Sequence, residues 1–213
     1  AYELLANDAS NAEIRVTTGG ESITVQVITS VIDVYEPDLR ATVYISDLNG
    51  GLAEPGDVLE YTVVAKNLGS DAANEVYAET VLDVRTSFME GSLEWVTPNA
   101  IPTMTDAMGD DQGEFEEDFQ TVRVRLGQGA NANQGGMLDN DPLGQDSIAY
   151  RYRVELTEDC LLLQCDETLT AEANIFGSGD ISGNSQTNDG ASGLVYANGC
   201  PVEEVTVLDV ATG

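Results

Sequence analysis

Histidine is absent from this sequence of 213 residues, and lysine occurs once, at Lys66. Histidine is the commonest general acid or base near neutral pH, so the serine–histidine and cysteine–histidine pairs of many hydrolases cannot form within the chain. Two carboxylates could act together as in glycosidases, but the sequence singles out no such pair. We therefore expect a protein that is not an enzyme.

Basic residues are also scarce. Eight lysines and arginines stand against 38 aspartates and glutamates, which gives a formal net charge of -30. A surface of this sign repels nucleic acid and anionic membranes, so neither is an expected partner. Cations, above all calcium, and a salty environment that screens self-repulsion are compatible with it. The excess acid can equally serve only to keep the surface soluble.

The sequence has no run of about 18 apolar residues, so we expect no insertion into a membrane. Apolar residues nevertheless make up 42% of the chain, which is enough to form a core. They alternate with polar residues in many short segments, and this period of two is typical of strands with one buried face. The pattern predicts an all-β protein.

Cysteine occurs three times. Cys160 and Cys165 could close a short disulfide loop, which leaves Cys200 either free or paired between chains. Three cysteines at this spacing, without histidine, match no common zinc site. We favour a disulfide in an oxidising, extracellular compartment over reduced, buried thiols.

Residues 47–83 contain the clearest strand signals. Turns are predicted at Asn49-Gly50-Gly51 and at Pro55-Gly56-Asp57. Alternation over 59–66, a turn at 67–70 and a returning strand at 76–81 then indicate a hairpin-like unit. Further strands are predicted over residues 39–46, 92–96, 120–126, 148–154, 169–176 and 201–210.

Short motifs in this region resemble the DUF11 conserved-repeat family of bacterial and archaeal surface proteins. They are Pro55-Gly56-Asp57, Tyr61-Thr62, Asn67-Leu68-Gly69 and the Ala73 to Val76 segment. The resemblance covers about residues 38–190 and is interrupted by an acidic insertion, 97–118. It implies an immunoglobulin-like antiparallel β-sandwich with long loops and extra terminal strands, used in fibres, stalks or adhesins. It supplies no catalytic residues.

The domain organisation predicted from these features has two parts, an N-terminal β segment over residues 1–36 and the sandwich over 37–213. Ile23, Val25 and Val27 alternate with polar residues in the first part. Such a strand can pair with a neighbouring subunit, or it can be an extra edge strand of its own domain. Residues 201–210 have a similar character, so each end of the chain can carry a linking strand.

Aspartates gather in three loops that could bind calcium through carboxylate and carbonyl oxygens. The candidate ligands are Asp106, Asp110, Asp111, Asp139, Asp141, Asp146, Asp180 and Asp189. Their order matches neither an EF-hand nor a repeated calcium-binding nonapeptide. The alternative is that these loops are simply solvated.

Arginines gather on two strands that follow one another in the sequence. Val122 and Val124 face one way and Arg123 and Arg125 the other; Arg151 and Arg153 alternate in the same manner. Since consecutive strands usually pair, we expect these four arginines on one face. That face can be an interface with an acidic surface of the next subunit, or glutamates of neighbouring strands can neutralise it.

Two functions fit these observations. The first is an extracellular structural subunit of a surface fibre or adhesin stalk, in which copies of the chain join head-to-tail by strand addition and charge-complementary contacts. The second is a calcium-dependent module that binds a glycan or another surface ligand through its acidic loops.

Overall fold

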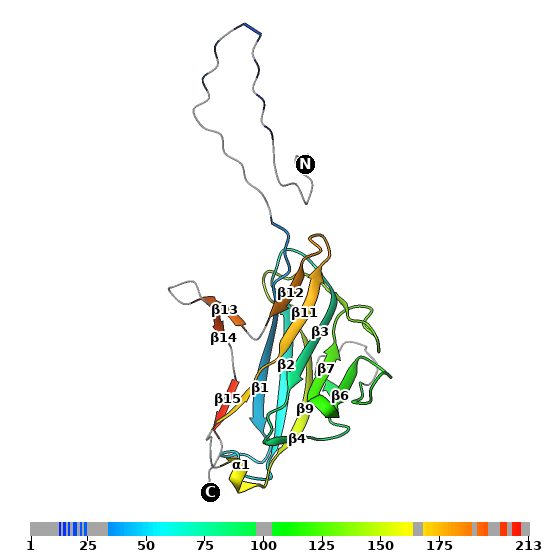
Figure 1. Ribbon diagram of the computed structural model, residues 1–213, viewed down its shortest axis with the longest axis vertical. Helices are drawn as coiled ribbons and strands as arrows, with labels where there is room; N and C mark the ends of the chain where they lie inside the picture. Colours follow the sequence, from blue (N-terminus) through cyan, green and yellow to red (C-terminus); the bar gives the residue numbers. More distant parts are fainter. Residues whose placement is uncertain are drawn as a thin grey trace.

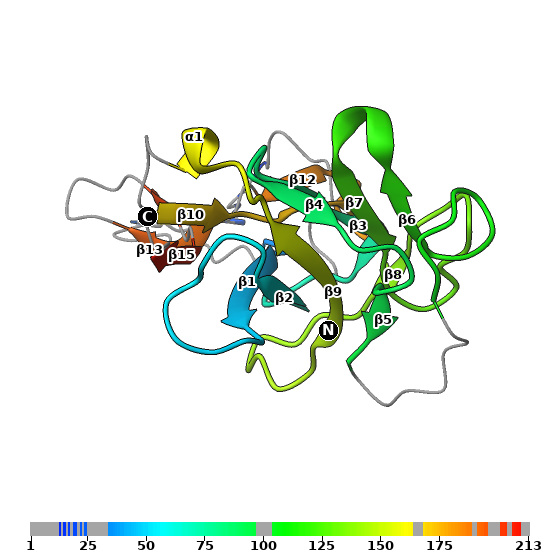
Figure 2. The ribbon, with the colours of Figure 1, turned by 90° about the horizontal axis from the view of Figure 1, so that it is seen from below.

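The structure is a computed structural model that describes residues 34–96, 104–163, 168–188, 191–195, 201–203 and 206–209, with single positions between 13 and 24. Two antiparallel sheets face each other as a sandwich (Figures 1 and 2). This confirms the all-β, immunoglobulin-like fold. The predicted strand at Ile23, Val25 and Val27, the Cys160–Cys165 disulfide and the ligand Asp189 lie outside the part described in atomic detail.

The first sheet has the strand order β1-β2-β9-β4. Its members are β1 (Leu39–Asp47), β2 (Val58–Asn67), β9 (Ile148–Leu156) and β4 (Thr86–Phe88), and the short β5 (Glu94–Trp95) also pairs with β9. β1 and β2 form a hairpin in which Val43 lies opposite Val63. The segment 47–58 that joins them contains both predicted turns.

The second sheet has the order β12-β11-β3-β7-β6. Its members are β12 (Ser185–Asn188), β11 (Asn174–Gly179), β3 (Ala73–Val81), β7 (Thr121–Arg125) and β6 (Gly113–Glu116), with β8 (Gly136–Leu138) on β3. A short 3-10 helix, η1 (Glu117–Phe119), joins β6 to β7. The two sheet orders correspond to the ABED and GFC sheets of immunoglobulin domains.

Smaller elements lie beside the sandwich. β10 (Thr168–Ala171) pairs with β15 (Thr206–Asp209), and β13 (Ala191–Val195) pairs with β14 (Pro201–Glu203). A single helical turn, α1 (Cys160–Leu163), follows β9. The predicted late strand 169–176 is therefore two strands, because the chain leaves β10 before it joins the second sheet as β11.

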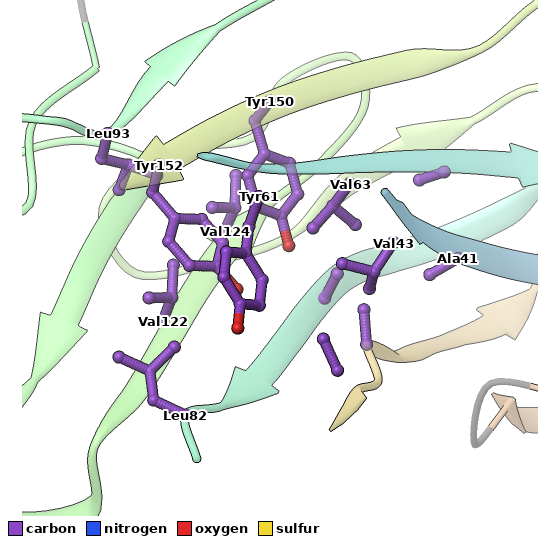
Figure 3. Close-up of a cluster of buried hydrophobic side chains, with 14 of the residues drawn as sticks. Ala41, Val43, Tyr61, Val63, Leu82, Leu93, Val122, Val124, Tyr150 and Tyr152 are labelled. Atoms are coloured by element: carbon purple, nitrogen blue, oxygen red, sulfur yellow. The ribbon is translucent and has the colours of Figure 1, made fainter. Parts of the chain in front are cut away.

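The core lies between the sheets and contains three tyrosines as well as aliphatic side chains (Figure 3). Buried and partly exposed residues alternate along all ten positions of β2. Tyr61 lies opposite Tyr152 on β9, and their rings stack with centroids 5.3 Å apart. Trp95 is partly buried at the edge of this core and packs edge-on against Tyr150.

The hairpin-like unit predicted over 47–83 is wrong in its pairing. β2 has β1 on one side and β9 on the other, so it offers no edge to β3. The chain instead crosses at residues 67–72 to the opposite sheet, where β3 lies between β11 and β7. The motif that resembles the DUF11 signature therefore forms a crossover between layers.

The described part of the acidic insertion, residues 104–118, is also more ordered than a solvated loop. Residues 113–116 form β6, which pairs with β7 along its whole length. Phe115 turns inward and stacks on Phe88 at a centroid distance of 4.2 Å, while Glu114 and Glu116 face the arginines of β7. The aromatic residue and the arginines explain how so acidic a segment joins the sheet.

The buried tyrosines predict a sharp alkaline transition. Burial raises the pKa of Tyr61, Tyr150 and Tyr152 above the ordinary value of about 10. Their neutral form therefore contributes stability that is intact below about pH 10 and is lost as the pH rises further. A near-ultraviolet absorbance titration should show these three ionising together with the loss of the circular dichroism of the fold.

The variant Tyr150→Phe provides a control for that titration, because the Tyr150 hydroxyl makes no hydrogen bond of good geometry and has only a marginal contact with the Thr80 hydroxyl. The variant should fold, and the absorbance change that accompanies ionisation of the buried tyrosines at high pH should be smaller by the contribution of one tyrosine. Ionisation of all tyrosines before any loss of structure would show that the three rings are accessible to hydroxide.

Candidate functional site

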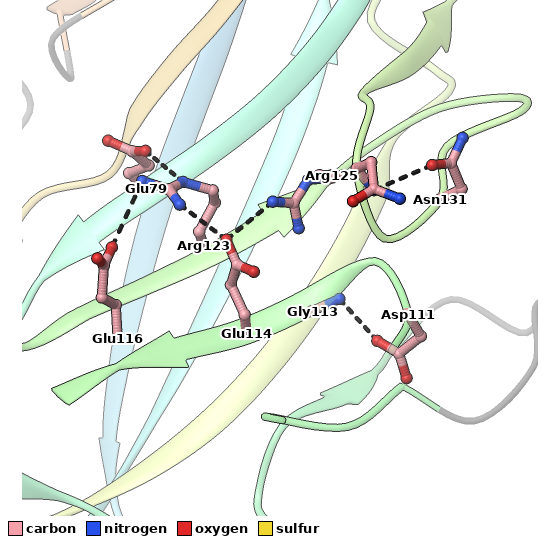
Figure 4. A network of polar contacts seen from close by, with 9 residues as sticks. Glu79, Asp111, Gly113, Glu114, Glu116, Arg123, Arg125 and Asn131 are labelled. Atoms are coloured by element: carbon pink, nitrogen blue, oxygen red, sulfur yellow. Dashed lines mark hydrogen bonds and ion pairs between the residues drawn. The ribbon is translucent and has the colours of Figure 1, made fainter. Parts of the chain in front are cut away.

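A cluster of charged side chains covers part of the outer face of the second sheet (Figure 4). Because β7 alternates, Val122 and Val124 enter the core and Arg123 and Arg125 face outward. The neighbouring strands place Glu79 and Glu114 directly opposite Arg123. We call Glu79, Glu114, Glu116, Arg123 and Arg125 the β7 charge cluster.

Glu114 is the centre of this cluster. Its side chain is 5% exposed, and its Oε1 accepts hydrogen bonds from Arg123 Nη1 at 2.7 Å and Arg125 Nη2 at 2.9 Å. Burial by itself raises the pKa of Glu114, but the hydrogen bonds and charges of the two arginines outweigh it and hold the pKa below its usual value. The carboxylate is therefore ionised and neutralised in place.

Arg123 is shared among three acids. It also bonds Glu79 through Nε, and its Nη2 lies 3.7 Å from Glu116 Oε2. Burial lowers the pKa of Arg123, but the hydrogen bonds with Glu79 and Glu114 raise it further, so the net direction is upward. The cluster carries more acid than base and is no positive surface.

The expectation that all four arginines share one face is wrong. β9 belongs to the first sheet and pairs with β2, β4 and β5, so Arg151 and Arg153 lie on the opposite outer face of the sandwich from Arg123. Arg151 Nε bonds Glu94 at 2.8 Å, and Arg153 Nε bonds Glu60 at 3.1 Å. Glutamates of neighbouring strands thus neutralise the arginines of β7 on one face and those of β9 on the other. This is the alternative that the sequence left open.

A pocket of about 330 Å³ adjoins the β7 charge cluster. It lies over β3 and β7 and beneath the loop that follows β7. Its lining residues are Glu75, Tyr77, Glu79, Arg123, Arg125, Asn133, Gln134 and Gly135. The Tyr77 ring stacks on Phe176 of β11, with centroids 4.8 Å apart and planes 15° apart. Sequence reasoning missed this pocket, since Tyr77, Asn133 and Phe176 are far apart in the chain.

The predicted calcium ligands mostly shape their own loops. Asp111 accepts hydrogen bonds from the N–H groups of Thr105 and Gly113, and Asp110 accepts one from the Thr105 hydroxyl. Asp106 accepts the Gly91 N–H group. Within the described ranges, no three acidic, histidine or cysteine side chains lie close enough together to hold a metal ion.

The other two acidic loops are organised in the same way. Asp141 accepts the N–H groups of Leu143 and Asp146, and these bonds lower the pKa of Asp141. Asp180 accepts a hydrogen bond from Asn74, and Asp139 is exposed. Calcium binding at these loops remains a prediction.

Two buried polar residues hold the crossover between the sheets. Asn67, 2% exposed, accepts hydrogen bonds from the N–H groups of Asp38 and Gly69 and donates to the carbonyls of Asp71 and Leu138. Asp71, 1% exposed, accepts the N–H groups of Ile181 and Ser182. Together they join the segment before β1, the loop after β8 and the turn between β11 and β12.

Comparisons with known proteins find only distant structural similarity. No family model matches the chain, including that of the DUF11 family, and no curated protein sequence matches it. Among solved structures, the chain is similar to the major pilin SpaD of Corynebacterium diphtheriae at 13% identity and a TM-score of 0.43, covering 71% of this chain and 33% of the pilin. The chain thus spans about a third of that pilin's length.

Two further solved structures are similar to the chain at the same level. The N-terminal domain of the Streptococcus gordonii adhesin Sgo0707 is 11% identical, with a TM-score of 0.42 and coverage of 81% of this chain and 32% of that one. A cohesin module from a Clostridium perfringens glycoside hydrolase is 11% identical, with a TM-score of 0.41 and coverage of 82% and 96%. Similarity this distant says nothing about ligands or partners.

A search for membrane-spanning helices among the described residues finds none of sufficient length and apolar character.

Replacing Asn67 with Ala should destabilise the fold strongly. The substitution leaves two N–H groups and two carbonyls without their partner, and each unsatisfied buried group costs about 1–3 kcal/mol. Chemical denaturation should show that the free energy of unfolding falls by on the order of 3 kcal/mol. This is less than the sum of the four penalties, because water can enter and bond some of the groups. Asn74→Ala is the matched control, since Asn74 makes one exposed bond to Asp180. Equal losses in the two variants would contradict the role assigned to Asn67.

Glu114→Gln tests the β7 charge cluster. Removing one partner of a buried ion pair costs about 3–5 kcal/mol, so unfolding at neutral pH should require much less denaturant. The lowered pKa of Glu114 gives stability that is present above the unfolded value of about 4.3 and is lost as the pH falls below it. The variant should therefore lose less stability than the parent on acidification.

Glu94→Gln is the control for this experiment, because Glu94 is 50% exposed and pairs with Arg151 at the surface. Its effect should stay within about 1 kcal/mol. If Glu114→Gln behaves like Glu94→Gln at every pH, the buried pairing of Glu114 does not stabilise the protein.

Proposed function

We propose that this chain is an extracellular structural module of a surface fibre or adhesin stalk, without enzymatic activity, in which copies join head-to-tail. The observation that carries the proposal is the distribution of exposed apolar side chains, which gather at the two ends of the sandwich. The contacts between copies would be made by these ends and by strand addition.

The path of the chain suits a module that works in series. Residues 34–38 lead into β1 at one end of the sandwich, which we call the near end (top of the sandwich in Figure 1). β15, the last described strand, runs antiparallel to β10 and ends with Asp209 opposite Thr168, next to α1 at the far end. A pulling force applied at residues 34 and 209 would therefore act approximately parallel to the strands of the sandwich.

Exposed apolar residues mark both ends. At the far end they lie in the connections after β1 and β3, in η1 and in α1: Leu48, Leu52, Val81, Val84, Phe119 and Leu162. At the near end they are Val34, Tyr35, Leu143 and Ile181. Three further apolar residues are exposed outside these two sets: Tyr44 on β1, Val96 after β5 and Met108 in the acidic insertion. Exposed apolar side chains that gather on one part of a surface are typical of protein contacts, and contacts between unlike ends produce open chains of subunits.

The net negative charge of the chain makes this assembly depend on ionic strength. Every arginine between residues 34 and 163 that the structure describes is ion-paired within its own chain, so no free arginine face remains to meet acid on a neighbour. Copies with a formal charge of -30 repel each other, and the repulsion falls as salt shortens the screening length. Apolar end contacts should therefore form best at high ionic strength.

Strand addition is the second part of the proposal. β12 and β6 are the outer strands of the second sheet as described, and a strand from another copy could extend the sheet at either position. The predicted donor is the segment containing Ile23, Val25 and Val27. Deleting residues 1–30 separates the two kinds of contact, because it leaves both apolar ends in place.

A double substitution at the far end tests the proposal. Val84 is 85% exposed and Phe119 67% exposed, so Val84→Ser with Phe119→Ser should change stability by about 0.5 kcal/mol or less per site. Sedimentation velocity should show oligomers of the parent chain that grow with sodium chloride concentration, and the double variant should remain smaller at every concentration. The control is Tyr44→Ser, an exposed residue on the outer face of β1.

Oligomers that are equally large in the double variant would rule out the far end as a joint. A parent chain that stays monomeric at every salt concentration would rule out assembly through apolar ends altogether.

A further inference from the structure

The pocket beside the β7 charge cluster has the features of a binding site. It lies on the outer face of the second sheet, and none of the aspartates proposed for calcium lines it. Its volume of about 330 Å³ is close to the lower limit of known ligand pockets, roughly 300–1,000 Å³, so it would hold a small group.

One wall of the pocket is aromatic. The sheet order β11-β3-β7 places Phe176 on one side of Tyr77 and Arg125 on the other. Since one face of the Tyr77 ring stacks on Phe176, its other face is turned toward β7 and the pocket. A ring held in this way offers a flat apolar surface whose orientation is already set before a ligand arrives.

The remaining wall is polar and balanced in charge. Glu75 and Glu79 lie with Arg123 and Arg125, which is unusual in a chain where acids outnumber bases by 38 to 8. Asn133 and Gln134 add amide groups that both donate and accept hydrogen bonds. Glu79 and Glu114 already engage the arginines, so the pocket favours neither an anion nor a cation.

Local backbone geometry keeps these groups in position. Glu75 has a φ of 55°, a left-handed conformation that costs about 1–2 kcal/mol for a residue with a side chain, and it sits where β3 shifts register against β8. Gly135 lies so close that a Cβ atom would be 2.4 Å from the Glu75 carbonyl carbon. Gln134 also donates a hydrogen bond to Glu75 Oε1 at 3.2 Å. The loop is thus fastened onto the strand, and the pocket is formed in advance.

We propose that this pocket binds a neutral saccharide unit without calcium. The apolar C–H face of a sugar ring would pack on Tyr77, and its hydroxyl groups, which donate and accept at once, would match Asn133, Gln134 and the carboxylates. This inference does not depend on the assembly of copies.

The test uses the full chain with maltotriose, cellotriose and triacetylchitotriose as neutral probes and trigalacturonate as an acidic one, in buffer containing EDTA. Saturation-transfer NMR should show contact with at least one neutral probe, and calorimetry should give its affinity. Tyr77→Ala should weaken that affinity at least tenfold, about 1.4 kcal/mol, whereas Tyr77→Phe, which keeps the ring, should stay within about threefold. Tyr44→Ala, on the other sheet, should have no effect.

A second variant covers the case in which Tyr77→Ala disturbs the sheet. Asn133→Ala changes a single exposed loop side chain, leaves the Gln134–Glu75 hydrogen bond in place and should also weaken binding. Three results would overturn the proposal: no binding of any neutral probe, unchanged affinity in both variants, or binding that appears only when calcium replaces EDTA. Stronger binding of trigalacturonate than of the neutral probes would overturn the assignment of a neutral ligand.

Discussion

The period-two alternation of the central strands is the constraint on which the rest of this structure depends. β2, β3, β7 and β9 each bury alternate side chains, most of them apolar or tyrosine, and turn mainly polar or charged ones outward, with Tyr77 of β3 as an outward exception. The inward set closes into one core around Tyr61, Tyr150 and Tyr152. The outward set leaves each outer face with arginines beside glutamates of adjacent strands, so a very acidic chain can cover both sheets without an unpaired charge at its centre.

The ends of the sandwich are stabilised in a different way. The strands stop there, so backbone N–H and C=O groups need hydrogen-bond partners outside the sheets. At the near end, Asn67 and Asp71 supply those partners from within the crossover between the layers. The acidic loops supply theirs through aspartates that accept backbone N–H groups. Exposed apolar side chains such as Val84 and Leu143 lie at the ends among exposed acids such as Glu117 and Asp139, and these apolar side chains are the physical basis of the proposed end-to-end assembly.

Much of this fold could be predicted from the sequence, since alternation identifies a strand and the face that it buries. The positions of β1, β2, β7 and β9 were all visible in this way. Alternation does not say which strand lies alongside, so the pairing expected between β2 and β3, and between β7 and β9, was wrong. β6 was hidden because Glu114 and Glu116 resemble loop residues until Arg123 lies next to them.

The candidate sites were less predictable for the same reason. Tyr77, Gln134 and Phe176 come together only because β3 lies between β7 and β11, and no local pattern contains that order. Electron microscopy of the full chain at high ionic strength tests the central claim, assembly through the ends, most directly. Linear chains of subunits whose sandwich axes follow the chain direction are the predicted result; monomers at every salt concentration, or subunits stacked side by side through their sheet faces, would contradict it.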